Sequence, residues 1–128
     1  TAVKIDPQSA MAFNNLAWAY ALTGEGKQAA QNCQSAITLK PNTPAYLDTC
    51  GLAYYNLKDY QNSVKYYTQA LDLAPNVPTT TICYRGRSNQ MLGNKTQAIE
   101  DYQVCLKYVE SGDLAKMAQD GLMQLNAK

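Results

Sequence analysis

Histidine is absent from the 128 residues of this chain. Histidine is the commonest general base and the most frequent metal ligand, and it is the residue that activates serine and cysteine nucleophiles. The 10 acidic residues do not replace it, because they are scattered and none has a partner that would set up acid–base catalysis. We therefore expect no enzymatic activity, no metal site and no cofactor.

A concentration of charge and a long apolar run are also missing. The 11 basic and 10 acidic residues are spread singly and give a net charge of +1. Nucleic-acid binders concentrate basic residues on one face, so we expect no nucleic-acid partner. No apolar run approaches the roughly 20 residues that span a bilayer, and the first residues lack the basic-then-apolar pattern of a signal peptide. We expect no membrane contact and a cytoplasmic location.

Three prolines recur at a constant spacing of 34 residues: Pro7, Pro41 and Pro75. Their surroundings are similar, as in Leu39-Lys40-Pro41-Asn42 and Leu73-Ala74-Pro75-Asn76. A fixed period of this size is typical of a repeat array, in which each unit buries its apolar face against its neighbours. The period therefore predicts a repeat architecture.

Helical spacing of apolar residues divides each period into two helices. Residues 10–22 and 27–39 form the first predicted pair, separated by Gly24-Glu25-Gly26. Thr43 and Pro44 suit the start of the next helix, and Asp59 suits the N-cap of its partner. The third pair is shifted by one residue, which falls in a loop at 77–81, and a last helix is predicted at 113–125. We expect a partial repeat at 1–9, repeats at 10–43, 44–78 and 79–112, and a capping helix at 113–128. A start within a repeat predicts that the chain is a piece of a longer protein.

The pattern resembles the tetratricopeptide repeat, W-x2-L-G-x2-Y followed by small, aromatic and small residues and a proline. The first repeat matches with Phe13, Leu16, Ala17, Tyr20, Ala29, Cys33, Ala36 and Pro41. The second matches with Leu47, Cys50, Gly51, Tyr54, Ser63, Tyr67, Ala70 and Pro75. The third departs most, with Arg85, Gly86 and Asn89 in place of Leu, Gly and Tyr. The resemblance implies an all-α fold, a right-handed superhelix of antiparallel helix pairs (an α-solenoid) with about three units and a C-terminal capping helix.

By the same resemblance, the first helices of the repeats line a concave groove that binds a protein or peptide segment. The residues placed there are Asn14, Trp18, Ala21, Asp48, Leu52, Tyr55, Arg87, Gln90 and Met91, with Cys83 in the row of Asn14 and Asp48. Trp18 is the only tryptophan, and Trp, Tyr and Arg dominate interface hot spots. Two interpretations of Trp18 stay open: contact with a ligand, or packing against an upstream repeat.

Some tetratricopeptide domains grip the C-terminal carboxylate of a chaperone with Lys and Asn on their first helices. The corresponding positions here carry Asn14, Trp18, Thr49, Thr80 and Tyr84, so the lysines are missing. We therefore expect a partner with hydrophobic anchors. The alternative is a structural segment of a longer solenoid, or a repeat that self-associates weakly through its exposed N-terminal end.

Two further expectations concern core positions. Arg85 stands where an apolar residue is usual, so its guanidinium should pair with an acid on the partner helix, Asp101 being the best placed. The four cysteines form no C-x-x-C pair, which argues against a zinc or thioredoxin-like site. We expect reduced, buried thiols in a reducing compartment, with a Cys33–Cys50 disulfide at the junction of the first two repeats as the alternative.

Overall fold

The computed structural model of the chain describes residues 7–74 and 79–126, and all regular secondary structure within these ranges is α-helical. The helices are α1 (Pro7–Leu22), α2 (Gly26–Leu39), α3 (Pro44–Asn56), α4 (Tyr60–Leu73), α5 (Thr79–Leu92), α6 (Lys95–Tyr108) and α7 (Asp113–Asn126). Consecutive helices form the pairs α1/α2, α3/α4 and α5/α6, which we call repeats one, two and three. The all-α fold predicted from the sequence is confirmed.

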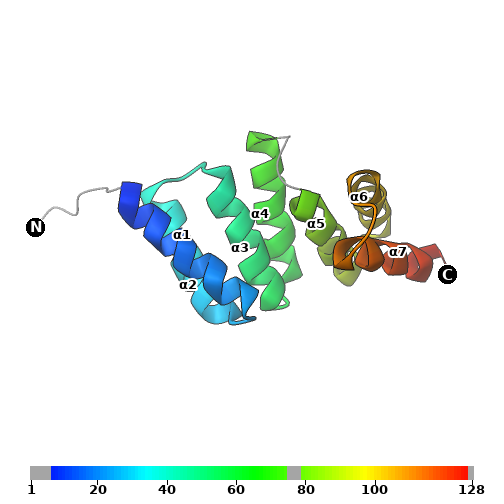
Figure 1. The fold of residues 1–128 in the computed structure, drawn as a ribbon, viewed down its shortest axis with the longest axis horizontal. Helices are drawn as coiled ribbons and strands as arrows, with labels where there is room; N and C mark the ends of the chain where they lie inside the picture. The colour runs from blue at the N-terminus through cyan, green and yellow to red at the C-terminus, as the bar shows by residue number, and fades with distance from the viewer. Residues whose placement is uncertain (1–6, 75–78, 127–128) are drawn as a thin grey trace, which may run out of the picture. The chain divides into compact units, whose positions relative to one another are not determined.

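The chain divides into two compact units, residues 1–75 and 76–128. The first unit holds α1–α4, drawn in blue to green in Figure 1, and the second holds α5–α7, drawn in yellow-green to red. In the first unit α3 packs on both α1 and α2. In the second unit α7 packs on both α5 and α6. Each unit therefore stacks a further helix on a complete helix pair.

The helix boundaries follow local signals in the sequence. Pro44 opens α3 behind Thr43, and the Asp59 carboxylate caps α4 by accepting a hydrogen bond from the backbone N–H of Asn62 at 3.3 Å. The observed α1 begins at Pro7, three residues before the predicted start at Ala10. Proline is tolerated in the first turn of a helix. Pro7, the first of the three prolines spaced by 34 residues, therefore begins α1. Residues 7–9 of the predicted partial repeat at 1–9 belong to α1, whereas its residues 1–6 and the loop residues Val77 and Pro78 lie outside the described residues.

Each repeat turns between its two helices in the same way. The residue at the end of the turn adopts a positive φ in all three repeats: Gly24 at 80°, Lys58 at 60° and Gly93 at 83°. The backbone N–H of the following residue then donates to a carbonyl five residues earlier, at 2.9 Å in each repeat. This is the geometry in which a left-handed residue satisfies the last carbonyls of a helix. Glycine adopts it without strain, whereas Lys58 carries a Cβ.

The helices of a repeat approach closely where a small residue faces a large one. A Cβ built on Gly51 would lie 2.6 Å from the Tyr67 ring, and one on Gly86 would lie 3.0 Å from Tyr102. Repeat one has Ala17 at the position of these glycines and Cys33 at the position of the tyrosines, and both are fully buried. The size of one side chain therefore compensates for the size of the other across the pair.

The last helix closes the second unit with an apolar face. Ala115, Ala118 and Gly121 are buried, and a Cβ on Gly121 would collide with the Tyr102 ring. Lys116, Gln119 and Asp120 lie on the opposite side, where α7 is exposed or only partly covered. An amphipathic terminal helix of this kind covers the apolar end of a repeat array.

Candidate functional site

The outer surface of α1 exposes large apolar side chains. Trp18 is 41% exposed and Leu22 is 63% exposed. Met11 and Leu16, on the same helix, are also exposed. On a helix Met11, Trp18 and Leu22 project within about 40° of one another and form one exposed apolar surface, whereas Leu16 projects to the other side.

This apolar surface carries almost no charge. None of the 16 residues of α1 is acidic or basic, and Asp48 is the one charged residue of α3. Neither helix therefore has a lysine or arginine that could neutralise an acidic ligand. An uncharged helix with exposed Trp and Leu favours apolar contacts over ion pairing.

The other predicted groove residues of the first unit lie at different depths. Ala21 and Leu52 are buried, whereas Asn14, Asp48 and Tyr55 are partly exposed. The Tyr55 ring packs edge-on against Tyr60 with 5.9 Å between the ring centroids. The side-chain carbonyl oxygen of Asn14 is buried without a hydrogen-bond partner in the part of the chain that the structure describes. Trp18 is thus the most accessible of these predicted residues.

A hydrogen bond joins the C-terminal ends of α1 and α3, the first helices of repeats one and two. The Asn56 side chain of α3 donates to the backbone carbonyl of Ala21 in α1 at 2.6 Å. The same Ala21 carbonyl also accepts a hydrogen bond from the backbone N–H of Gly24 at 3.2 Å, in the turn that follows α1. The end of α1 that carries Trp18 and Leu22 is therefore held to α3.

In the second unit, the predicted residues are partly engaged by their own unit. Gln90 donates to the Gln124 side chain of α7 at 2.8 Å, and its oxygen accepts from Arg87 at 3.4 Å and from the Tyr102 hydroxyl. Met91 is exposed. Cys83, which the resemblance placed in the groove, is instead fully buried, because it contributes to the core between α5, α6 and α7. Its placement in the groove was wrong.

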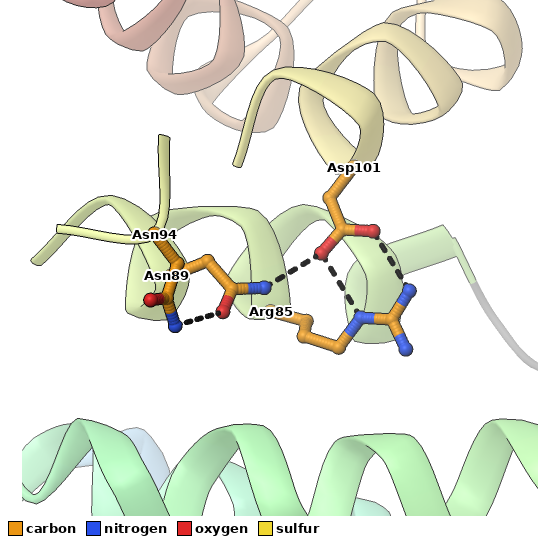
Figure 2. Close-up of polar contacts among 4 residues, drawn as sticks. All are labelled: Arg85, Asn89, Asn94 and Asp101. Atoms are coloured by element: carbon orange, nitrogen blue, oxygen red, sulfur yellow. Dashed lines mark hydrogen bonds and ion pairs between the residues drawn. The ribbon is translucent and has the colours of Figure 1, made fainter. Parts of the chain in front are cut away.

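Figure 2 shows how the Arg85 guanidinium is satisfied. Its Nε donates to one Asp101 oxygen at 2.9 Å, and its Nη2 donates to the other at 2.7 Å. Asn89 donates to the same carboxylate at 3.2 Å, and Asn94 donates to the Asn89 oxygen at 3.2 Å. The predicted pairing of Arg85 with Asp101 is confirmed. The network joins α5 to α6 and belongs to the core of repeat three, since Asp101 is buried.

The cysteines are paired in the structure, which corrects the expectation of reduced thiols. Cys33 in α2 forms a disulfide with Cys50 in α3, and Cys83 in α5 forms one with Cys105 in α6. The Cα–Cα distances are 5.4 and 5.1 Å, within the usual range for a disulfide. Helical spacing placed three of the four cysteines at core positions and Cys83 in the groove row, and it did not show which cysteines face one another.

A polar junction between the first two repeats was also not predicted. The Gln34 side chain of α2 donates to the hydroxyl of Tyr54 at 3.1 Å and to that of Tyr66 at 2.7 Å. The two tyrosine rings stack with their centroids 5.5 Å apart. Gln34 follows Cys33 directly, so the disulfide and this polar cluster fasten the same junction. A glutamine within a helix carries no sequence signal of such a role.

Neither a metal-binding cluster nor a membrane-spanning helix occurs among the described residues. Among the described residues, no group of three or more His, Cys, Asp or Glu side chains could hold a metal ion. Over the same ranges, no helix has the length and apolarity needed to cross a membrane.

Part of the chain matches a known protein family. Residues 44–77 match the family model described as tetratricopeptide repeat. The fold is that of a tetratricopeptide repeat protein. No curated protein sequence matches the chain. The tetratricopeptide fold predicted from the sequence is thereby confirmed.

Several solved structures share this fold. The first tetratricopeptide domain of Spaghetti (RPAP3), bound to the HSP90 peptide SRMEEVD, has a TM-score of 0.81 and 19% identity, over 98% of this chain and 97% of that one. The second domain of human RPAP3, in complex with the HSP70 peptide SGPTIEEVD, has a TM-score of 0.80 and 19% identity, over 96% of this chain and 100% of that one. The domain of Arabidopsis OM64 has a TM-score of 0.80 and 18% identity, over 92% and 97%.

Proposed function

We propose that this tetratricopeptide domain is a protein-interaction module that binds a protein or peptide segment in a concave groove lined by the first helix of each repeat. In the first unit the accessible residues of this surface are Asn14, Trp18, Asp48 and Tyr55, and the predicted residues Ala21 and Leu52 are buried beneath them. We propose a corresponding role for Arg87, Gln90 and Met91 on α5 of the second unit. The observation that carries the proposal is the exposure of Trp18, the only tryptophan, on an uncharged helix.

The chemistry of α1 and α3 supports a partner with hydrophobic anchors. The solved relatives with HSP90 and HSP70 peptides hold segments that end in Glu-Glu-Val-Asp. Such a segment brings several negative charges, and binding it requires cationic side chains to replace its hydration. α1 and α3 contain no lysine or arginine, and the Arg85 guanidinium of α5 already pairs with Asp101. The shared fold is therefore proposed to serve a different class of ligand.

A peptide selection tests the surface. Peptides would be selected from a random display library against the wild-type domain, and their affinities measured for the variants Trp18→Ala and Arg87→Ala. Loss of a buried hot-spot side chain costs roughly 2 kcal/mol, so Trp18→Ala should weaken binding about 30-fold. Leu16→Ala is the matched control, because Leu16 is an exposed apolar residue of the same helix that projects about 200° away from Trp18. Unchanged affinity in Trp18→Ala and Arg87→Ala, with intact folds, would show that the surface is misassigned.

The peptide SRMEEVD tests the proposed chemistry of the partner. Isothermal titration of the wild-type domain with this peptide should show no saturable binding in the micromolar range. Micromolar binding that salt weakens would contradict the proposal, because it would require a cationic site. The Arg87→Ala variant would then identify whether that residue supplies the charge.

The alternative is that α1 packs against further helices of a longer solenoid or against a second copy of the chain. The exposure of Leu16, on the side away from Trp18, favours this alternative for that side of the helix. Light scattering at rising concentration tests the self-association version. A strictly monomeric protein would contradict it, and association that Leu16→Ala reduces would support it.

A further inference from the structure

Both disulfides join residues that are fully buried, and each lies within one unit. Cys33–Cys50 connects the second helix of repeat one to the first helix of repeat two, whereas Cys83–Cys105 connects the two helices of repeat three. The two disulfides therefore differ in the structural elements that they join. One fastens neighbouring repeats, and the other fastens a single repeat internally.

The small side chain of Cys33 leaves repeat one with a smaller apolar core than the other two repeats. The equivalent residues Tyr67 and Tyr102 are fully buried aromatics, and a buried tyrosine removes roughly 150–250 Å² from water. A cysteine at this position removes far less apolar area. A covalent bond to Cys50 offsets this loss, because a disulfide restricts the unfolded chain. The Gln34 cluster, which reaches Tyr54 and Tyr66, holds the same two repeats together.

We infer that the Cys33–Cys50 disulfide is a structural clasp between repeats one and two, and that the protein acquires both disulfides in an oxidising environment. Each bond forms by exchange with a disulfide oxidant such as glutathione disulfide or an oxidoreductase. The two cysteine thiols lose two protons and two electrons as the S–S bond forms, and the oxidant's disulfide is reduced to two thiols. The inference does not depend on the proposed function, and it points to a compartment other than the reducing cytoplasm expected from the sequence.

Burial distinguishes a structural clasp from a redox switch. Exchange requires a thiolate to reach the disulfide sulfur, and none of the four cysteines is accessible in the folded chain. Reduction should therefore need opening of the helix packing. Millimolar dithiothreitol should release thiols from the folded protein at least 10-fold more slowly than from the protein in denaturant.

Peptide mapping tests the connectivity directly. The protein would be refolded with a mixture of reduced and oxidised glutathione, denatured, alkylated with iodoacetamide without reduction, and cleaved before aspartate. Asp48, Asp59, Asp72 and Asp101 then place the four cysteines in four different peptides. Mass spectrometry should find peptide 6–47 linked to 48–58, and peptide 72–100 linked to 101–112. Four alkylated cysteines, or any other pairing, would overturn the inference.

Thermal unfolding tests the stabilising role of the clasp. The double variant Cys33→Ala/Cys50→Ala should unfold roughly 10 °C below the oxidised wild type. In the presence of reductant, wild type and variant should unfold within a few degrees of each other. The variant Cys83→Ala/Cys105→Ala is the matched control for loss of a disulfide within one repeat. Equal unfolding temperatures for oxidised and reduced wild type would contradict the clasp.

Discussion

Repeats one and two have the same backbone plan, but their equivalent residues have different surroundings. Leu16 of α1 is 49% exposed, whereas Cys50 at the equivalent position of α3 is fully buried. Cys50 is buried because α3 packs on α1 and α2. In the described part of the chain, no helix covers the side of α1 that carries Leu16. The comparison teaches that a position in the repeat does not fix burial. Burial follows from the neighbours that the position meets.

The same two repeats also differ in how their helices fit together. Repeat two combines Gly51 with Tyr67, and repeat one combines Ala17 with Cys33. The first combination buries more apolar area, but it leaves no room for a Cβ at the glycine. The second has a smaller core and adds a disulfide to repeat two. Two solutions to one packing problem therefore lie side by side in one unit.

The largest expected difference between the repeats comes from truncating a leucine in each. Leu47 is only 5% exposed, so Leu47→Ala should lower the free energy of unfolding by roughly 2–5 kcal/mol. Leu16→Ala removes the same atoms from a half-exposed site and should cost less than about 1 kcal/mol. Urea unfolding followed by circular dichroism measures both. Equal costs would show that another part of the protein covers Leu16 in solution.

A Cβ added where the helices cross should have a smaller effect. Gly51→Ala places a methyl group against the Tyr67 ring, and overpacking of this kind costs roughly 1–3 kcal/mol. The reverse change in repeat one, Ala17→Gly, should cost roughly 1–2 kcal/mol, because it loses helix propensity and a buried methyl group but creates no steric conflict. Denaturant unfolding of the two variants compares these costs. A neutral Gly51→Ala would contradict the compensation between the paired side chains.

The smallest effect is expected at the turns, and its sign should differ between the repeats. Lys58→Gly in repeat two should stabilise the protein by about 1 kcal/mol, because it removes a Cβ from a left-handed residue. Gly24→Ala at the equivalent turn of repeat one should destabilise it by a similar amount. Thermal unfolding detects both shifts. A destabilised Lys58→Gly variant would mean that the lysine side chain makes a contact worth more than the strain.

The sequence predicted the features that depend on local patterns. Residue spacing placed the helices, Pro44 and Asp59 marked helix starts, and the repeat period gave the tetratricopeptide fold. The Arg85–Asp101 pair was also predictable, because an unpaired charge at a core position needs a partner on the facing helix.

Features that depend on which surfaces meet could not be predicted. Helical periodicity turned Cys83 toward the groove and left the cysteine pairs undecided, because pairing depends on distances between helices. The exposure of Leu16 and the role of Gln34 depend on neighbours in the same way. The site residues stay predictions, and of these Trp18 and Met91 are the ones whose exposure supports a binding role.

Fluorescence of Trp18 tests the central claim most directly, because the chain contains no other tryptophan. The measurement is the emission maximum of Trp18, and its quenching by acrylamide, during titration with a library-selected peptide that itself lacks tryptophan. We predict a shift of the emission to shorter wavelength and reduced quenching at saturation, because binding should bury a side chain that is 41% exposed in the free domain. Saturable binding that leaves both signals unchanged would contradict the account.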